Sequence, residues 1–377
     1  MKTRIAVLGA GFGGLELTAS LSEALGDRVD VALIDKSDAF VFGYAKLDVL
    51  FGRATPDAVR IPYGALAKTG VRMLRETVTA IDVHAKKVTT NAGTHEADIL
   101  VIGLGADDDP AATPGLVPGQ NEFYSMAGAE QLATRLLGFN KGHAVVGVCG
   151  APYKCPPAPS ECALMLHDFL TERGVRGDCT ITLANPLPSP VPPSPETSKA
   201  LIAAFAERGI NYLPSHRARS IDAARKMVVA GEGKELPCDL FLGVPKQRAP
   251  DVVVATGLTK DGWVQVDGKT LETEVPGVYA IGDLADTGAP KAGVFAEGTG
   301  RTVAQNLIAK LQGREGTAKN PGAGSCYIEF GAGRVARVDV DFLSGPKPTG
   351  AFHAPSAELR TEKQRFGSTR RARWFKA

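Results

Sequence analysis

The sequence predicts an α/β protein with two Rossmann-like dinucleotide-binding domains in tandem and a C-terminal β/α extension. Three observations carry this prediction: a glycine-rich loop between a strand and a helix in residues 4–35, an imperfect copy of that pattern in residues 143–184, and a short strand ending in Gly-Asp in residues 275–283. A chain of 377 residues, 44% of them hydrophobic, can bury the two cores that this plan needs.

The first unit is predicted from its apolar runs. Residues 4–8 and 29–34 indicate buried parallel strands, and residues 15–25 indicate the helix between them. The loop before the helix has the G-x-G-x-x-G pattern in the strand–loop–helix context that the motif requires. We expect it to bind the pyrophosphate of a dinucleotide, because the first N–H groups of a helix have no partners within the helix. Its residues are Gly9, Ala10, Gly11, Phe12, Gly13 and Gly14.

The acid at the end of the second strand completes this motif. Asp35 is positioned to accept hydrogen bonds from ribose hydroxyls, and it would repel a 2′-phosphate. Residues 97–106 indicate a strand and turn that return the chain to the same site. Lys36, Val78 and Gly105 are expected to line that site as well.

The second unit lacks the chemistry of the first. Its strands are predicted at residues 143–149 and 179–184, with a helix at residues 159–173. Four prolines interrupt the loop at residues 150–159, where they remove N–H donors, and two of the three expected glycines are missing. The second strand is followed by Asn185 instead of an acid. We therefore expect this domain to have lost nicotinamide binding.

Residues 275–283 are similar to a segment of flavoproteins that contain two dinucleotide-binding domains. In those proteins a Gly-Asp pair lies against the ribityl and phosphate groups of FAD, so the similarity implies that Gly282 and Asp283 bind FAD. A turn with a surface Asp is the alternative. The helix predicted at residues 292–311 would direct its positive end at a reduced flavin, with Lys291, Ala292 and Gly293 at its start.

This similarity divides the chain into three parts. Residues 1–110 with 250–318 are predicted to form an FAD-binding domain, and residues 111–249 a second Rossmann-like domain that carries Cys155. Residues 319–377 would form a C-terminal segment with Cys326 and a basic tail.

The cysteines do not form the pattern of a secreted disulfide-rich protein. Cys155 follows the first strand of the second unit, at the edge of the sheet where ligands bind, and we expect Lys154 and the nearby helix start to favour its thiolate. Glu161 is either a proton shuttle for this thiol or a carboxylate that stabilises the helix dipole. By local sequence, Cys326 is a buried residue at the start of a strand. Small buried side chains are expected at Cys149, Cys162, Cys179 and Cys238.

Residues 148–161, VCGAPYKCPPAPSE, closely resemble the signature of sulfide:quinone oxidoreductases and of the flavoprotein subunit of flavocytochrome c sulfide dehydrogenase. The resemblance extends over essentially the whole chain, including residues 250–283 and the Cys-Tyr pair at residue 326. It implies that Cys155 and Cys326 form a redox pair, that Glu161 is an acid/base, and that sulfide is oxidised to sulfane sulfur or polysulfide. It further implies attack of HS⁻ on the disulfide, after which the freed thiolate, taken as Cys326, reduces FAD, with sulfide or a persulfide as the physiological substrate.

The acceptor of the electrons is expected to be a quinone. No C-x-x-C-H motif provides a haem, and no export signal is visible, so a cytochrome acceptor is the alternative and a cytoplasmic, peripheral membrane location is expected. Because no cysteine precedes Cys149, FAD should be non-covalent. A formal net charge of +2 gives no reason to expect nucleic acid as a partner, and a homo-oligomer is left open.

Residues 356–377 are basic and contain aromatic residues. This composition suits the surface of an anionic bilayer, where quinone is available, and the alternative is a helix that docks on its own protein. Gly367 is expected to interrupt a long helix here. The basic residues are Arg360, Lys363, Arg365, Arg370, Arg371, Arg373 and Lys376.

Three other functions compete with this interpretation. An NADH:quinone reductase shares the two-domain plan, but the proline-rich loop opposes it. A thioredoxin-reductase-like enzyme would need closely spaced redox cysteines, whereas Cys149 and Cys155 are spaced C-x₅-C. A catalytically silent flavoprotein that senses redox state is the third.

Overall fold

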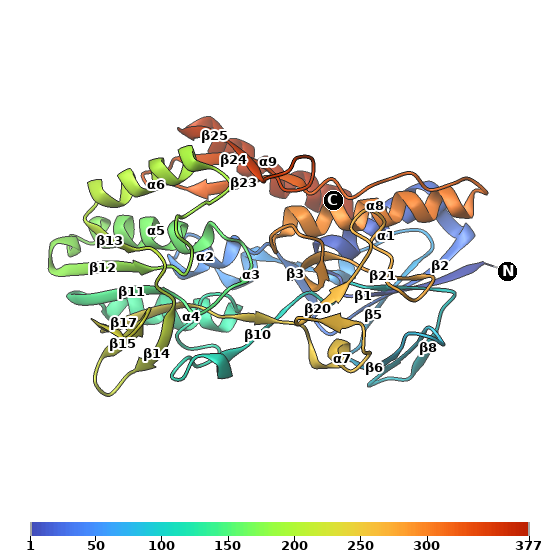
Figure 1. Ribbon diagram of the computed structural model, residues 1–377, viewed down its shortest axis with the longest axis horizontal. Coiled ribbons are helices and arrows are strands. Elements are labelled where there is room, and N and C mark those ends of the chain that lie inside the picture. Colours follow the sequence, from blue (N-terminus) through green and yellow to red (C-terminus); the bar gives the residue numbers. More distant parts are fainter. Residues whose placement is uncertain (1, 376–377) are drawn as a thin grey trace.

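A five-stranded parallel sheet lies in the half of the protein that contains the first residues of the chain (Figure 1). The computed structural model describes residues 2–375. The strand order is β21-β9-β1-β2-β5, with β1 at the centre, and every pairing is parallel. The strands are β1 (Thr3–Leu8), β2 (Val29–Asp35), β5 (Val71–Arg75), β9 (Ile99–Ile102) and β21 (Val278–Ala280).

Both faces of this sheet are covered, which is why β1, β2 and β9 are nearly continuous apolar runs. On one face Ile5 and Val7 pack with α1 (Phe12–Leu25) and α8 (Gly293–Leu311). On the other face Ala6 and Leu8 pack with residues of smaller elements. These elements are β6 (Val78–Asp82), β7 (Lys87–Thr90), α7 (Asp251–Val254), β20 (Trp263–Gln265) and β22 (Ala285–Asp286). β8 (Thr94–Glu96) pairs with β7, and β19 (Thr259–Lys260) pairs with β20.

The other half contains a four-stranded parallel sheet in the order β13-β12-β11-β17. Here β11, α5 and β12 repeat the β1, α1, β2 plan, so the predicted α/β fold with two Rossmann-like units in tandem is confirmed. The strands are β11 (Gly142–Val148), β12 (Cys179–Ala184), β13 (Ile210–Leu213) and β17 (Leu240–Val244). The helices are α2 (Ala45–Leu50), α3 (Pro56–Val59), α4 (Met126–Gly138), α5 (Ala158–Glu172) and α6 (Pro195–Glu207).

Short antiparallel strands complete the two halves and join them. β10 (Asp107–Asp108) pairs with β18 (Gln247–Arg248) where the chain crosses between the halves in both directions (Figure 1). The other strands are β3 (Ala39–Val41), β4 (Arg60–Pro62), β14 (Ala218–Asp222), β15 (Met227–Ala230) and β16 (Lys234–Pro237).

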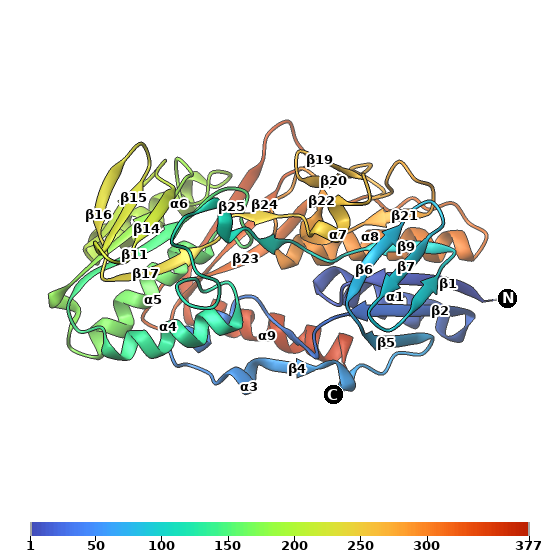
Figure 2. The ribbon, with the colours of Figure 1, turned by 90° about the horizontal axis from the view of Figure 1, so that it is seen from below.

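The C-terminal segment forms a three-stranded antiparallel sheet and one long helix. The sheet consists of β23 (Ala323–Glu329), β24 (Val335–Asp341) and β25 (Thr349–Ser356), and its apolar face joins the core that contains α5. From there α9 (Ala357–Trp374) returns toward the first half of the protein (Figure 2). The predicted C-terminal β/α extension is therefore present, and Cys326 lies in the middle of β23 instead of at its start.

Gly367 does not interrupt α9, so that expectation was wrong. The helix continues through Gly367, which is buried, and a Cβ atom built there would lie 2.4 Å from the Tyr44 hydroxyl oxygen. The glycine therefore allows close packing of the helix on the protein, which outweighs its low helix propensity.

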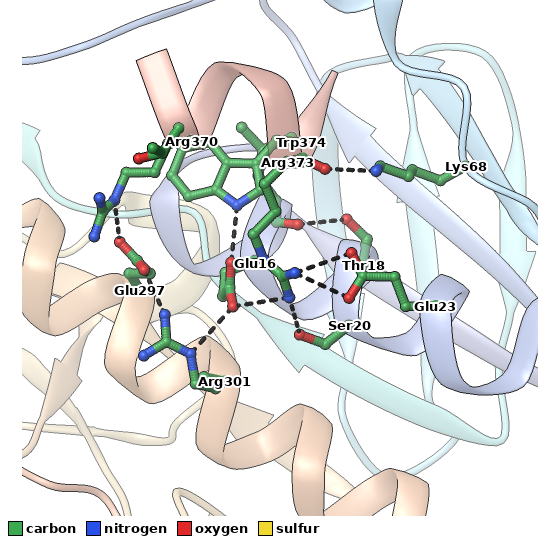
Figure 3. Close-up of polar contacts among 12 residues, drawn as sticks. Glu16, Thr18, Ser20, Glu23, Lys68, Glu297, Arg301, Arg370, Arg373 and Trp374 are labelled. Atoms are coloured by element: carbon green, nitrogen blue, oxygen red, sulfur yellow. Dashed lines mark hydrogen bonds and ion pairs between the residues drawn. The ribbon is translucent and has the colours of Figure 1, made fainter. Parts of the chain in front are cut away.

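The end of α9 is anchored by a polar network around the buried Glu16 carboxylate (Figure 3). The Arg373 guanidinium donates to Glu16 at 3.0 Å and to Glu23 at 2.9 Å, and the Trp374 indole N–H donates to Glu16 at 2.9 Å. Burial raises the pKa of Glu16, but the hydrogen bonds from Arg373 and Trp374 outweigh this and hold the pKa below its ordinary value. A second pair joins Arg370 to Glu297 at 2.6 Å.

This anchoring corrects the expectation that the tail reaches a bilayer with its aromatic residues. Trp374 and Phe375 are 1% and 2% exposed and lie in the core of the first half, so they cannot insert into a membrane from this position. The alternative, a helix docked on its own protein, is what the structure shows. Lys376 lies outside the described residues. Among residues 2–375, no helix is both long enough and apolar enough to cross a bilayer.

Candidate functional site

A cavity of about 590 Å³ opens between the glycine-rich loop and the start of α8. The carboxyl edge of the first sheet forms its floor, as expected for a ligand site in a parallel sheet. Twelve of the predicted cofactor-binding residues line it: Gly9, Gly11, Phe12, Gly13, Asp35, Lys36, Val78, Gly105, Gly282, Asp283, Ala292 and Gly293.

Ala10 and Gly14 are absent from the lining and shape the loop instead. The Ala10 N–H donates to the Asp35 carboxylate at 2.7 Å, and the Ala10 carbonyl accepts from the Tyr63 hydroxyl at 2.7 Å. A Cβ atom on Gly14 would stand 2.0 Å from the Gly9 carbonyl oxygen, so only glycine lets the helix pack this closely. Asp35 therefore holds the glycine-rich loop in addition to lining the cavity.

Lys291 connects the cavity to the candidate reactive cysteine. Its ammonium donates to the Asp283 carbonyl at 2.5 Å and lies 3.4 Å from the centroid of the Trp263 ring. Its own carbonyl accepts the N–H of Cys155 at 2.8 Å. The turn that carries Cys155 is thus tied to the segment just before α8.

Cys155 and Cys326 come together although their elements lie in different parts of the sequence. Both cysteines are free and half-buried, and both pack against the core that contains α5. They lie close enough for Cys326 to affect the pKa of Cys155. Cys155 precedes α5 with a left-handed backbone, φ 53°, a conformation that costs a non-glycine residue on the order of 1–3 kcal/mol. Cys155 lines the cavity and Cys326 is not among the lining residues, so the expectation that Cys326 is the sulfur next to the flavin does not agree with this geometry.

The electrostatics of the thiols also differ from expectation. Burial raises the pKa of Cys155 well above its ordinary value, and the Glu161 carboxylate and Cys326 raise it further. Lys154 does not counter this, because its ammonium donates to the Ala106 carbonyl at 3.0 Å and lies 3.8 Å from Asp108. Burial likewise raises the pKa of Cys326 to about 12. Both thiols therefore favour the protonated form in this reduced state.

Glu161 is a buried carboxylate beside the two thiols. It stands in the first turn of α5, but its side chain accepts the Glu329 N–H at 3.0 Å and lies 3.8 Å from the Lys363 ammonium. It therefore faces β23 instead of capping its own helix, which argues against the helix-dipole alternative. Burial raises its pKa to about 6, so it can exchange a proton near neutral pH.

Lys363 is a site residue that sequence reasoning missed. The sequence grouped it with the basic tail, whereas the structure buries it at 8% exposure between Glu329, at 2.7 Å, and Glu161. Its ammonium also lies 5.1 Å from the centroid of the Tyr44 ring. No local pattern distinguishes Lys363 from the exposed lysines and arginines of α9, and only the packing of that helix identifies it.

The start of α5 leaves no donors for a second pyrophosphate. The Ala158 N–H donates to the Cys155 carbonyl, Pro159 has no N–H, and the N–H groups of Ser160 and Glu161 donate to the Pro157 carbonyl. β23 packs on the same end of the helix, where Glu161 meets Glu329. This geometry supports the loss of nicotinamide binding by the second unit.

The sequence comparisons decide the family. A sequence model of the pyridine nucleotide-disulphide oxidoreductase family matches residues 3–306. The chain belongs to this family. This oxidoreductase is thus an FAD-dependent enzyme, as its sequence predicted.

Individual relatives confirm the resemblance to sulfide:quinone oxidoreductases. The mitochondrial sulfide:quinone oxidoreductase of Schizosaccharomyces pombe is 24% identical over 291 residues, which cover 72% of this chain and only 63% of the relative. That of Dictyostelium discoideum is 24% identical over 356 residues, 90% of this chain and 78% of the relative. The structure of the sulfide:quinone oxidoreductase from Aquifex aeolicus has the same fold, with a TM-score of 0.87 at 20% identity over 97% of this chain and 90% of that one.

The cavity of this oxidoreductase fits FAD. The Asp283 Oδ1 atom is buried and has no hydrogen-bond partner among the described residues, as expected for an acceptor whose donor is a bound polyhydroxyl chain. Gly11 and Gly105 have no atom within 4 Å of the place where a Cβ would stand, so the loop is bounded by open space that a ligand can fill. The donors, the unpaired acceptor and the size of the cavity therefore agree with the cofactor.

Proposed function

We propose that this protein oxidises sulfide to sulfane sulfur through Cys155 and Cys326 and passes the electrons through FAD to a quinone. One observation carries the proposal: Cys155 lines the dinucleotide cavity, and Cys326 and the buried Glu161 carboxylate, from distant parts of the chain, lie close enough to raise its pKa. Sulfide as the substrate and quinone as the acceptor are inferred from the similarity of the chain to sulfide:quinone oxidoreductases.

FAD would be held along the whole cavity. The glycine-rich loop and the start of α1 would bind its pyrophosphate, and Asp283 would accept from its ribityl hydroxyls. Its ring would lie near Cys155 and the start of α8, whose positive end favours negative charge there. When bound, FAD supplies a two-electron acceptor beside the Cys155 sulfur.

The residues of the chain account for the sulfur and proton steps. In the oxidised enzyme, HS⁻ attacks the Cys155–Cys326 disulfide, so that one S–S bond forms, the other breaks, and a persulfide and a thiolate result. Because burial raises the pKa values of both thiols, the departing thiolate needs a proton. Glu161, with a pKa of about 6, can take a proton from H₂S and return it to that thiolate.

A second pocket is suited to the acceptor. It has a volume of about 340 Å³ and lies along α9 and β23, with Tyr327 and Phe366 in its wall. Val294 lines this pocket while the preceding residue, Gly293, lines the FAD cavity, so the two spaces lie on either side of one turn of α8. The two aromatic side chains offer a quinone ring a surface to pack on, while the rest of the wall is mostly polar, with Ser325, Glu362, Arg365, Thr369 and Arg370.

Anaerobic stopped-flow spectroscopy of the flavin tests the proposal. Sulfide should reduce the wild-type flavin in one turnover, whereas Cys155→Ser and Cys326→Ser should leave it oxidised. Cys238→Ser is the matched control, because Cys238 is a buried cysteine in a different core cluster. Reduction of all variants at one rate, or reduction by NADH and not by sulfide, would overturn the proposal.

A further inference from the structure

A smaller cavity of about 110 Å³ also has Cys155 in its wall. It lies between the start of α2, the segment before α4 and the start of α5. Its wall is largely apolar, with Leu47 and Phe123 among its residues, but it also contains Lys46, Lys154 and Glu161. The Lys154 ammonium donates to the Ala106 carbonyl at 3.0 Å and lies 3.8 Å from Asp108. Two lysines, the Cys155 thiol and a proton-exchanging carboxylate thus face one small space.

Lys46 keeps an unneutralised positive charge. Among residues 2–375 it forms no salt bridge, and its ammonium donates to the Tyr124 carbonyl, which uses one of its three N–H groups. The nearby carboxylates are engaged elsewhere. Glu122 accepts from the Tyr124 N–H at 2.6 Å and the Ser125 N–H at 2.8 Å, and Asp108 accepts from Gln247 at 2.6 Å.

The cavity is small. Its volume of about 110 Å³ is about a third of that of the pocket along α9 and β23, and HS⁻ or a short sulfane chain fits in it. The positive charge of Lys46 and the apolar wall suit a small, weakly hydrated sulfur anion.

We propose that this cavity is the binding site for the sulfide substrate, and that Lys46 holds HS⁻ against the sulfur of Cys155. This rests on the proposed function and adds to it a substrate site and a direction of attack. HS⁻ reaches the disulfide from the side of Cys155, so the persulfide forms on Cys155 and Cys326 is the leaving group.

The step balances within the described residues. Glu161 takes the proton of H₂S, and the resulting HS⁻ is held by Lys46. A bond forms between its sulfur and the Cys155 sulfur while the Cys155–Cys326 bond breaks, and the electron pair leaves on Cys326, which takes the proton from Glu161. H₂S and the disulfide thus give a persulfide on Cys155 and a thiol on Cys326. The terminal sulfur of the persulfide stays beside Lys46.

The test compares Lys46→Gln, which removes the charge but keeps a donor for the Tyr124 carbonyl, with Lys46→Arg, which keeps the charge. Lys141→Met is the control, because Lys141 is an exposed lysine outside both cavities. Flavin reduction by sulfide is followed in the holoenzyme, and the half-saturating sulfide concentration is measured. It should rise at least about tenfold in Lys46→Gln, rise less in Lys46→Arg, which keeps the charge, and stay at the wild-type value in Lys141→Met.

Binding of thiocyanate, a small anion that cannot reduce the disulfide, gives a readout that is independent of turnover. Its inhibition of sulfide-dependent reduction should be competitive in the wild type and at least about tenfold weaker in Lys46→Gln. If Lys46→Gln keeps the wild-type half-saturation and the wild-type inhibition, Lys46 only ties α2 to the Tyr124 carbonyl and the inference is wrong. If sulfide fails to reduce even the wild-type flavin, the proposed function itself is wrong.

Discussion

Replacement of Trp374 by alanine should be one of the most destabilising single changes in the C-terminal segment. The ring is 1% exposed, and its centroid lies 5.6 Å from the centroids of both Phe12 and Phe40 in edge-on geometry. Truncation of a buried tryptophan to alanine costs about 3–5 kcal/mol. We expect a loss of that size in the free energy of unfolding, against roughly 5–15 kcal/mol for a typical native protein.

Two further variants separate the contribution of ring packing from that of the hydrogen bond and provide an exposed control. Trp374→Phe keeps most of the packing and removes the hydrogen bond to the Glu16 carboxylate, so it should cost about 1.5–3 kcal/mol, the range for hydrogen bonds to charged groups. Leu137→Ala changes a side chain that is 68% exposed and should cost less than about 0.5 kcal/mol. Because Phe12 also lines the FAD cavity, Trp374→Ala should weaken FAD binding as well.

The assay is urea denaturation of the flavin-containing protein, followed by circular dichroism and by flavin fluorescence. A cost below about 1 kcal/mol for Trp374→Ala, with unchanged FAD release, would refute the docking of α9 on the first half.

Three other predictions follow from the site. Replacing Gly11 with alanine should leave the apoprotein stable, because a Cβ there meets no atom within 4 Å. It should weaken FAD binding, which a flavin titration measures, because the loop could no longer approach the pyrophosphate closely. Unchanged affinity for FAD would contradict a pyrophosphate site at this loop. The rate of flavin reduction by sulfide should rise as the pH increases through about 6, where Glu161 becomes able to accept a proton, and should be pH-independent there in Glu161→Gln. Lys363→Met should lower the free energy of unfolding by about 3–5 kcal/mol, because buried carboxylates lose their neighbouring cation. It should also raise the pKa of Glu161, so the pH at which the rate of flavin reduction rises should be higher than in the wild type. A pH profile at the wild-type position would argue against this contact.

Thiocyanate provides a pH test of the substrate cavity. Burial, followed by the like charge of Lys154, lowers the pKa of Lys46 to about 8, while Asp108, Glu122 and Cys155 oppose that shift. Inhibition by thiocyanate should therefore weaken as the pH rises through about 8 in the wild type. The same titration of Lys46→Gln should show no such change, and a parallel loss in both proteins would contradict a role for the charge.

Local sequence predicted the elements that depend on local chemistry. The first strand was expected at residues 4–8 and is found at Thr3–Leu8, and the last long helix was expected at residues 292–311 and is found at Gly293–Leu311. Apolar periodicity and glycine in the loop determine these elements wherever the rest of the chain lies. Most of the predicted cofactor residues therefore line one cavity.

Contacts between distant segments could not be predicted in this way. Lys46 and Lys363 look like ordinary surface lysines in the sequence, and they gain their roles from the packing of α2 and α9 on the rest of the protein. Gly367 was misjudged for the same reason, because the hydroxyl that requires glycine there belongs to Tyr44. The proximity of Cys155 to Cys326 was inferred from a family resemblance, since nothing local shows that β23 packs on α5.

Electron flow from sulfide to quinone through this flavin can be measured by anaerobic turnover of the purified protein with sulfide and a short-chain quinone. We expect quinone to be reduced only when sulfide is present, with one sulfane sulfur formed per quinone, and Cys155→Ser to abolish both. Quinone reduction that NADH supports and sulfide does not would contradict this expectation.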